Sequence, residues 1–484
     1  MEKKFSRRQF LAIAGTTAAG AALVACAPAA PAPVATTAPK ATDAPVATVA
    51  PADAVSINMW GWTDLVNTQI VDEFTKAKGI KVKLSDLGDA VFGDQKFLTA
   101  VSAGTGPDVS IQNRHTFMQF SAKKLYKDVT PLMGTDQIKV EDFTPVQIKE
   151  TSWNGKVFGL PMFTDVRYMY WNKKHFKEVG LDPEKPPTTW AELEAATGKL
   201  NIKNSKGEYD RYGFVPYGFG NSWMWLYGFI NKAPSISDDK RTILCDDPKW
   251  VEALNWMVKF YDNYVGSFEM ASTFGQAITS AGIGDPFSAG KVSIDASGDW
   301  EVGNWIRNPD LDWGAAPMPI SPNGEKSTWS CGWSVVMAPS TKQEKAAWEL
   351  IKWHVLPEGY RARAEAAKAD TLRVWAREKI QGEAMYWPTQ ACYKPTLSML
   401  ETEYVAKLPE KEKAAWTLGM DALTNWTHGC GTEMGVAALQ YWVEMDNAVK
   451  TALGKKASAA EALAAAKKKV QDATDAAWKS IDAG

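Results

Sequence analysis

The sequence predicts an α/β protein built from at least two domains. Apolar and polar residues alternate at positions 55–60, 80–84 and 109–111, which is the period of β-strands. Helical apolar patterns lie between these segments, and the order strand, helix, strand, helix, strand implies a parallel sheet covered by helices. The 484-residue chain is also too long for one ordinary hydrophobic core, even without a leader segment.

The first 26 residues have the composition of an export signal. Arg7 and Arg8 precede a weakly apolar run at 10–25, as in a twin-arginine signal. Leu23-Val24-Ala25-Cys26 resembles the bacterial lipoprotein box, whose Cys is lipidated. A transmembrane helix is disfavoured because the run has 16 residues diluted by Gly and Thr, whereas a span needs about 20. We expect residues 1–25 to be removed and Cys26 to anchor the protein extracytoplasmically, at the outer face of the cell membrane.

Residues 26–53 are rich in Ala, Pro and Thr and contain no aromatic residue. Such a tract buries too little apolar surface to offset its ordering entropy. Proline keeps a chain of this kind extended, at about 3.1 Å per residue where polyproline II holds. We therefore expect a tether between the lipid anchor and the folded body.

Charge and motif content exclude several function classes. The formal net charge is −2, with 54 basic and 56 acidic residues, so no basic field favours nucleic acid as a partner. No phosphate loop, dinucleotide fingerprint or nucleophile elbow is present. No two of the four histidines have the helical spacing of a zinc pair. We expect no cofactor and no protein-bound metal.

The cysteines leave the disulfide pattern open. Besides Cys26 the chain has four, at positions 245, 331, 392 and 430, with no Cys-x-x-Cys among them. Export permits disulfides, and four thiols allow three full pairings that the sequence does not rank. Buried free thiols are an equally good expectation.

Helix-capping signals are also recognisable. Thr63 or Asp64 is placed to cap a helix that carries Leu65 and Ile70. Thr189 with Glu192, and Ser458 with Glu461, have the spacing of capping boxes. We interpret both boxes as structural.

Three blocks of sequence carry a family resemblance. They are Ser102–Val109, the stretch from Val157 through Leu193, and the segments 289–300 and 346–352. Together they resemble the family 1 extracellular solute-binding proteins of ABC importers, the maltose-binding-protein-like group. The resemblance implies a two-lobe, periplasmic-binding-protein-like α/β fold with a mixed β-sheet in each lobe and a ligand cleft between the lobes.

From the block positions we expect an N-terminal lobe of residues 54–164 plus 333–395 and a C-terminal lobe of residues 165–332 plus 396–484. The resemblance implies a monomer that captures a sugar or short oligosaccharide without breaking a bond and delivers it to ABC permease transmembrane subunits. A secreted carbohydrate-active enzyme, a receptor for a non-sugar polar solute and an adhesion lipoprotein are the alternatives.

Tryptophan is unusually frequent, at 22 of 484 residues, and many lie in loops or at strand ends. Flat aromatic rings suit the apolar face of a pyranose, and planar polar groups suit its hydroxyls. The alternative is that these rings fill a large interior, as we expect for Trp256, Trp348 and Trp353. The candidate ligand-binding residues are Trp60, Trp62, Asp64, Asn113, Arg114, Asp165, Trp223, Trp225, Trp300, Gly332, Trp333 and Trp387.

The resemblance assigns roles to some of these positions. Asp165 corresponds to a carboxylate that contacts sugar in maltose-binding relatives, and Trp300 to their stacking Trp. Asn113, Arg114 and His115 follow the strand after which relatives place polar ligands. Trp223 or Trp225 lies where relatives place another aromatic, and Gly332-Trp333 at a second crossing between lobes. Arg114 and Arg167 are alternatively surface residues, because Arg is mostly exposed unless paired.

Overall fold

A computed structural model describes residues 55–87, 95–218, 223–281, 285–306, 308, 310–380, 384–429 and 433–483. The predicted signal and tether, the lipidation site Cys26 and also Cys430 lie outside these residues.

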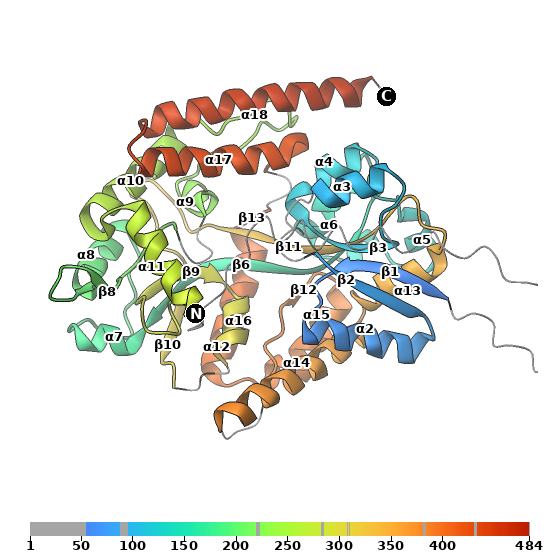
Figure 1. Ribbon diagram of the computed structural model, residues 1–484, viewed down its shortest axis with the longest axis horizontal. Helices are drawn as coiled ribbons and strands as arrows, with labels where there is room; N and C mark the ends of the chain where they lie inside the picture. The colour runs from blue at the N-terminus through green and yellow to red at the C-terminus, as the bar shows by residue number, and fades with distance from the viewer. Residues whose placement is uncertain are drawn as a thin grey trace, which may run out of the picture. The chain divides into compact units, whose positions relative to one another are not determined.

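A mixed β-sheet forms the centre of the described chain (Figure 1). Its path runs β10-β6-β11-β3-β1-β2, and β9, β12 and β13 pair with strands of that path. Strands β1, β2 and β3 are parallel, as predicted, whereas β11 and β6 are antiparallel to their neighbours on this path. The strands are β1 (Ser56–Gly61), β2 (Lys81–Asp86), β3 (Val109–Asn113), β6 (Leu160–Asn172), β9 (Ile294–Gly298), β10 (Trp313–Ala316), β11 (Thr328–Met337), β12 (Gln390–Ala391) and β13 (Thr427–Gly429).

Strand β6 is shared by two parts of the sheet. Residues from Leu160 to Val166 pair with β11 and β12, and residues from Arg167 to Asn172 pair with β9 and β10. Successive side chains of a strand point to opposite faces, so Asp165 and Arg167 lie on the same face where the two parts meet.

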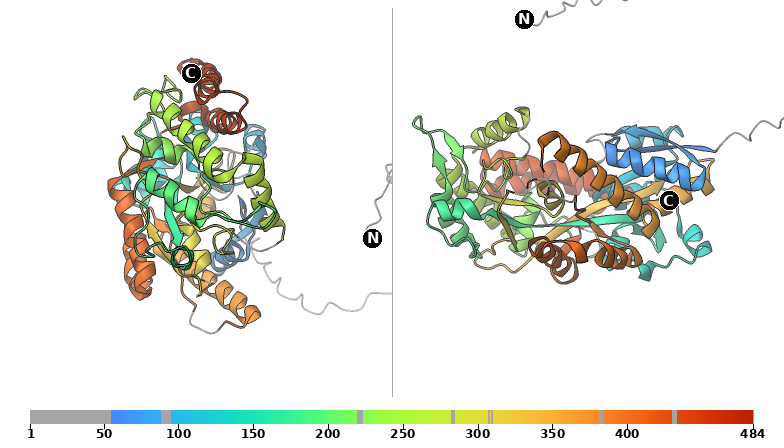
Figure 2. Two further views of the ribbon diagram at one scale, coloured as in Figure 1. Left: turned by 90° about the vertical axis from the view of Figure 1, so that its left-hand side faces the viewer. Right: turned by 90° about the horizontal axis from the view of Figure 1, so that it is seen from below.

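Helices pack on both parts of the sheet. The last two, α17 and α18, lie side by side, and α14 lies beside α2 (Figures 1 and 2). The α-helices are α2 (Leu65–Lys78), α3 (Gln95–Ser102), α4 (Phe117–Ala122), α5 (Thr130–Thr135), α6 (Pro145–Glu150), α7 (Lys173–Glu178), α8 (Trp190–Leu200), α9 (Met224–Ile230), α10 (Pro248–Phe260), α11 (Phe268–Ser280), α12 (Trp300–Trp305), α13 (Glu344–Trp353), α14 (Pro357–Glu378), α15 (Lys394–Glu403), α16 (Glu410–Asn425), α17 (Ala438–Leu453) and α18 (Ala459–Asp482).

Shorter elements connect them. A 3₁₀ turn, η2 (Arg114–Thr116), follows β3 directly, and a π-helical turn, η4 (Tyr261–Val265), extends α10. Small hairpins pair β4 (Ser152–Trp153) with β5 (Lys156–Val157) and β7 (Ile202–Lys203) with β8 (Tyr209–Arg211). The remaining 3₁₀ turns are η3 (Val140–Asp142), η5 (Val405–Lys407) and η6 (Gly435–Ala437).

The predicted helix caps are largely present. Asp64 caps α2, because its carboxylate accepts a hydrogen bond from the backbone N of Asn67 at 2.8 Å. Ser458 and Glu461 form the complete capping box of α18. Thr189 caps α8, but Glu192 reaches back to Thr188.

Hydrophobic residues gather in several separate clusters. One lies around β1, β3, α2 and α13, a larger one around α8, α9, α10, α17 and α18, and a third beside the second half of β6. Trp256, Trp348 and Trp353 are buried in the first two, as predicted. None of the described helices is both long and apolar enough to cross a bilayer.

The cysteines combine both expectations. Cys331, in β11, is disulfide-bonded. Cys245 and Cys392 are free and buried. Burial raises the pKa of each of these two thiols to about 12, so neither is a reactive thiolate at neutral pH.

Candidate functional site

Asp165 and Arg167 form a buried ion pair on β6. The pair joins Arg167 Nη1 to Asp165 Oδ1. The backbone N of Cys331, on the adjacent β11, donates to the same carboxylate oxygen at 3.3 Å. The surface alternative for Arg167 is therefore wrong, because its side chain is 7% exposed and paired.

Two tryptophan rings flank the Arg167 guanidinium. Its Cζ lies 4.1 Å from the ring centroid of Trp329 and 5.1 Å from that of Trp300. Both distances are in the range of cation–π contacts. Trp300 Nε1 donates to Glu301 at 3.1 Å, which fixes the orientation of the indole.

The row of aromatic rings continues through Trp442 of α17. Its ring centroid lies 5.9 Å from that of Trp329 and 4.9 Å from that of Trp223, which precedes α9. The His115 ring, on η2, lies 5.3 Å from Trp442. Segments more than 300 positions apart in the sequence thus meet at one place.

Asn113 ends β3 beside this row and holds His115. Its side-chain oxygen accepts from the His115 backbone N at 3.1 Å and lies 2.6 Å from His115 Nδ1. We call the assembled set the tryptophan site. It comprises Asn113, His115, Asp165, Arg167, Trp223, Trp300, Trp329 and Trp442.

Some donors of the tryptophan site lack acceptors. Within the described residues, no hydrogen-bond acceptor satisfies Arg167 Nε or Trp329 Nε1, although both nitrogens are buried. Buried donors without partners are costly, and a ligand rich in oxygen atoms would supply acceptors.

A second aromatic pair neighbours the site. Trp62 and Trp333 make an edge-to-face contact with centroids 4.5 Å apart, and Trp333 pairs in register with Asn113. Trp60 packs against Phe97 at 6.4 Å and lies under Lys96. All three rings are partly exposed.

Other predicted residues have structural roles instead. Trp225 and Trp387 are buried in the hydrophobic core at 2% and 5% exposure, which is the interior alternative for loop tryptophans. Asp64 is an exposed helix cap. Trp225 nevertheless contacts the tryptophan site, because its ring centroid lies 6.5 Å from that of Trp442.

Arg114 also belongs to the framework rather than to the surface. It is fully buried and ion-paired with Glu150 at 2.7 Å. Its guanidinium donates to the carbonyl oxygens of Phe163 at 2.7 Å and Trp333 at 3.2 Å, one on β6 and one on β11. Arg114 thus holds together the two long strands that carry the site.

Gly332 occupies a position that only glycine fits. Its φ is +139°, and a Cβ placed there would lie 2.4 Å from Phe163 O and 2.8 Å from Arg114 Nη2. Gly332→Ala should therefore destabilise the fold by more than about 1 kcal/mol. Gly134→Ala, in α5 with open space around it, is the matched control and should be neutral or stabilising. Urea denaturation of both variants checks this, and equal stabilities would contradict it.

A buried carboxyl lies behind the site. Asp299 is fully buried, and neither carboxylate oxygen has a hydrogen-bond partner among the described residues. Burial, and secondarily the negative charge of Asp165, raises the pKa of Asp299 to about 8. At neutral pH the Asp299 carboxyl is thus mostly protonated.

This shift predicts a pH dependence of stability. Unfolded Asp has a pKa of about 3.9, so between roughly pH 4 and pH 8 the folded state binds the proton that the unfolded state releases. The free energy of unfolding should therefore fall as pH rises through this window, and Asp299→Asn should flatten the fall. Denaturation at several pH values measures it, with exposed Asp310→Asn as control. If the free energy of unfolding of Asp299→Asn depends on pH as that of the parent does, the raised pKa of Asp299 does not cause the fall.

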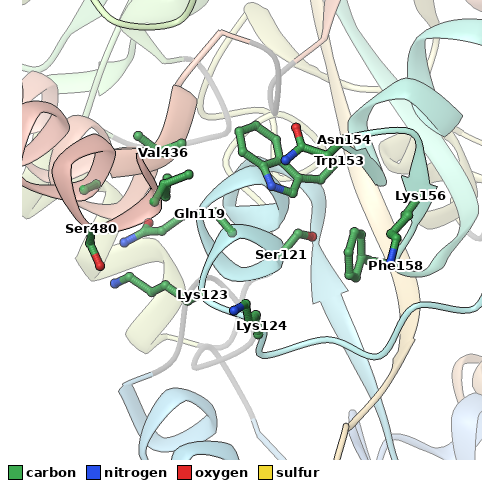
Figure 3. A pocket seen from close by; sticks show the side chains of 13 residues that line it. Gln119, Ser121, Lys123, Lys124, Trp153, Asn154, Lys156, Phe158, Val436 and Ser480 are labelled. Atoms are coloured by element: carbon green, nitrogen blue, oxygen red, sulfur yellow. The ribbon is translucent and has the colours of Figure 1, made fainter. Parts of the chain in front are cut away.

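A separate hollow lies away from the tryptophan site. It has a volume of about 690 Å³ and is lined by residues that include Trp153, Phe158 and the lysines at 123, 124 and 156 (Figure 3). None of the predicted ligand residues lines it. Its wall combines α4 and the β4–β5 hairpin with the end of α18, so we do not place the ligand there.

Among the described residues, no group of three or more His, Cys, Asp or Glu is arranged to hold a metal ion.

A family model described as "Bacterial extracellular solute-binding protein" matches residues 69–372. The chain belongs to this family. The resemblance seen in the sequence is thereby confirmed.

Solute-binding relatives share parts of this chain. A putative binding protein of Brucella abortus is 26% identical over 259 residues, which are 53% of this chain and 60% of the relative. A maltooligosaccharide ABC transporter solute-binding lipoprotein of Streptococcus pneumoniae is 24% identical over 329 residues, or 65% of this chain and 71% of the relative. The match to the Brucella protein thus spans less than two thirds of that protein's length.

The fold is also shared with solved structures. CpMnBP1 with mannotriose bound superposes with a TM-score of 0.70 at 22% identity, over 86% of this chain and all of that one. This likeness confirms the predicted two-lobe α/β fold with a mixed sheet.

The candidate ligand-binding residues predicted from the sequence did not include Arg167, Trp329 or Trp442, which belong to the tryptophan site. Trp329 and Arg167 were recognisable as a strand-end Trp and an Arg beside Asp165. Trp442 lies within a helix, where the spacing favours a core role, so no local signal distinguished it.

Proposed function

We propose that this chain is the extracytoplasmic binding component of an ABC importer and that it binds a sugar or short oligosaccharide at the tryptophan site. The observation that carries the proposal is the row of Trp300, Trp329, Trp442 and Trp223 beside the Asp165–Arg167 pair. Trp223, Trp300 and Trp442 are partly exposed, so their faces can contact the apolar face of a pyranose, whereas Trp329 is buried. The Asp165–Arg167 pair offers an acceptor and donors to the sugar hydroxyls.

The relatives support this ligand class. The Streptococcus pneumoniae relative is named for maltooligosaccharides, and CpMnBP1 was solved with mannotriose bound. The matching family model is described as a solute-binding protein and the Brucella abortus relative as a putative binding protein, which supports capture without catalysis. A glycosidase would need two carboxyl groups that reach the substrate. Asp165 is the one carboxylate that the proposed site offers to a sugar, and the carboxyl group of Asp299 next to it is fully buried.

The arrangement of strands supports a hinge between two lobes. Residues up to about Asp165 pair with β11 and β12, and the following residues pair with β9 and β10. We place the lobes at 54–164 plus 333–395 and at 165–332 plus 396–484. A ligand that contacts residues of both lobes favours the closed state, in which the protein meets its permease as a monomer.

Native mass spectrometry of the freshly purified protein tests the proposed function without assuming the sugar. We expect a bound mass that fits one or more hexose units, and unchanged sugar after incubation with maltotriose or mannotriose. Hydrolysis products would favour the enzyme. Absence of binding to any oligosaccharide, together with a bound non-sugar solute, would favour a receptor for a non-sugar polar solute.

The proposed lipid anchor is tested separately. Cys26→Ser should release the protein from the membrane fraction, because the acyl chains would be lost and the tether has no apolar run of its own. Cell fractionation and immunoblotting measure the distribution. A variant that fractionates with membranes as the parent does would require another anchor.

A further inference from the structure

The centre of the tryptophan site holds two opposite charges that cancel. Arg167 is 7% exposed and Asp165 is 9% exposed, and the two groups pair directly. Asp299, the third ionisable group behind them, is mostly neutral at pH 7 because burial and Asp165 raise its pKa to about 8. The positive charge of Arg167 is therefore already balanced by the carboxylate of Asp165, and the site needs no negative charge from a ligand.

Charge balance matters here because the pair is shielded from water. Trp300 and Trp329 flank the guanidinium, and ionic interactions are stronger where water is excluded. A ligand carboxylate or phosphate would have to share Arg167 with the carboxylate of Asp165. Two like charges around one buried cation disfavour each other, and the negative charge of Asp165 likewise contributes, after burial, to the raised pKa of Asp299.

An uncharged hydroxyl meets no such penalty. It donates to Asp165 and accepts from Arg167 Nε, the buried donor that has no acceptor within the described residues. On the proposed function, we infer that the Asp165–Arg167 pair is the specificity determinant of the tryptophan site, and that it admits neutral saccharides and rejects saccharides bearing a carboxylate or phosphate.

The pair also predicts how this selectivity can be changed. Asp165→Asn keeps the size of the side chain but removes its negative charge, so Arg167 becomes an uncompensated buried cation. An acidic sugar would then supply the missing charge. Replacing both residues, as Asp165→Asn/Arg167→Gln, removes the cation again and should abolish the gain.

The experiment compares matched ligands by calorimetry. Maltotriose and mannotriose are titrated beside the same trisaccharides oxidised at C6 to uronates, into the parent protein, Asp165→Asn, the double variant and exposed Asp72→Asn as control. We expect the parent and Asp72→Asn to bind a neutral form at least tenfold more tightly than its uronate. We expect Asp165→Asn to improve uronate binding at least tenfold.

The outcomes separate this inference from the proposed function. Equal binding of neutral and oxidised forms by the parent protein would leave saccharide binding in place and overturn the selectivity. A folded Asp165→Asn without gain for uronates would also overturn it. If Asp165→Asn does not fold, the comparison of neutral and oxidised trisaccharides in the parent protein decides. Binding of neither form by the parent would contradict the proposed function and this inference with it.

Discussion

Replacing Arg114 with methionine is expected to destabilise the fold by about 3–5 kcal/mol. Arg114 and Glu150 have no exposed side-chain surface, and they pair at 2.7 Å. The substitution leaves the Glu150 carboxylate buried without its cation and removes the hydrogen bonds that link Phe163 O and Trp333 O. Urea denaturation gives the change in the free energy of unfolding.

A second variant separates the charge effect from the loss of packing. Arg114→Met/Glu150→Gln carries no buried charge, so it should recover a large part of the stability that Arg114→Met loses. A single variant as stable as the parent would show that the pair does not hold the strands together. No recovery in the double variant would assign the loss to packing and hydrogen bonds alone.

Trp300→Ala and Trp442→Ala should each weaken saccharide binding by roughly tenfold or more. Loss of an aromatic contact removes about 0.5–1.5 kcal/mol beyond the buried area, and about 1.4 kcal/mol corresponds to a factor of ten. Both rings are partly exposed, so we expect the variants to fold. Calorimetry with maltotriose and mannotriose measures the affinities.

The matched control is Trp153→Ala, which removes a partly exposed ring from the separate hollow of Figure 3. The affinity of Trp153→Ala for maltotriose and mannotriose should equal that of the parent protein. A loss of binding in Trp153→Ala with none in Trp300→Ala and Trp442→Ala would move the ligand from the tryptophan site to that hollow.

Local patterns predicted the first half of the sheet well. The alternation at 55–60, 80–84 and 109–111 corresponds to β1, β2 and β3, and the spacing of Ser458 and Glu461 identified the start of α18. These features depend on neighbouring residues, so one sequence contains them. Strand β13 has three residues and pairs with β11 in parallel across about 100 positions, for which the sequence holds no local signal.

The candidate site was predicted only in part for the same reason. Asp165, Asn113, Trp223 and Trp300 lie in the tryptophan site, but Trp225 and Trp387 fill the core. A Trp in a loop and a Trp in a core have the same local composition, and packing between distant segments decides between them. The burial of Arg114 likewise depends on Glu150 and on two strands far along the chain.

A crystal structure of the protein with mannotriose or maltotriose tests the central claim most directly. We predict sugar density against the rings of Trp300 and Trp442, with sugar oxygens within hydrogen-bond distance of Asp165 and of Arg167 Nε. Sugar density confined to another place, such as the hollow lined by Trp153 and Phe158, with the tryptophan site free of sugar, would contradict the account.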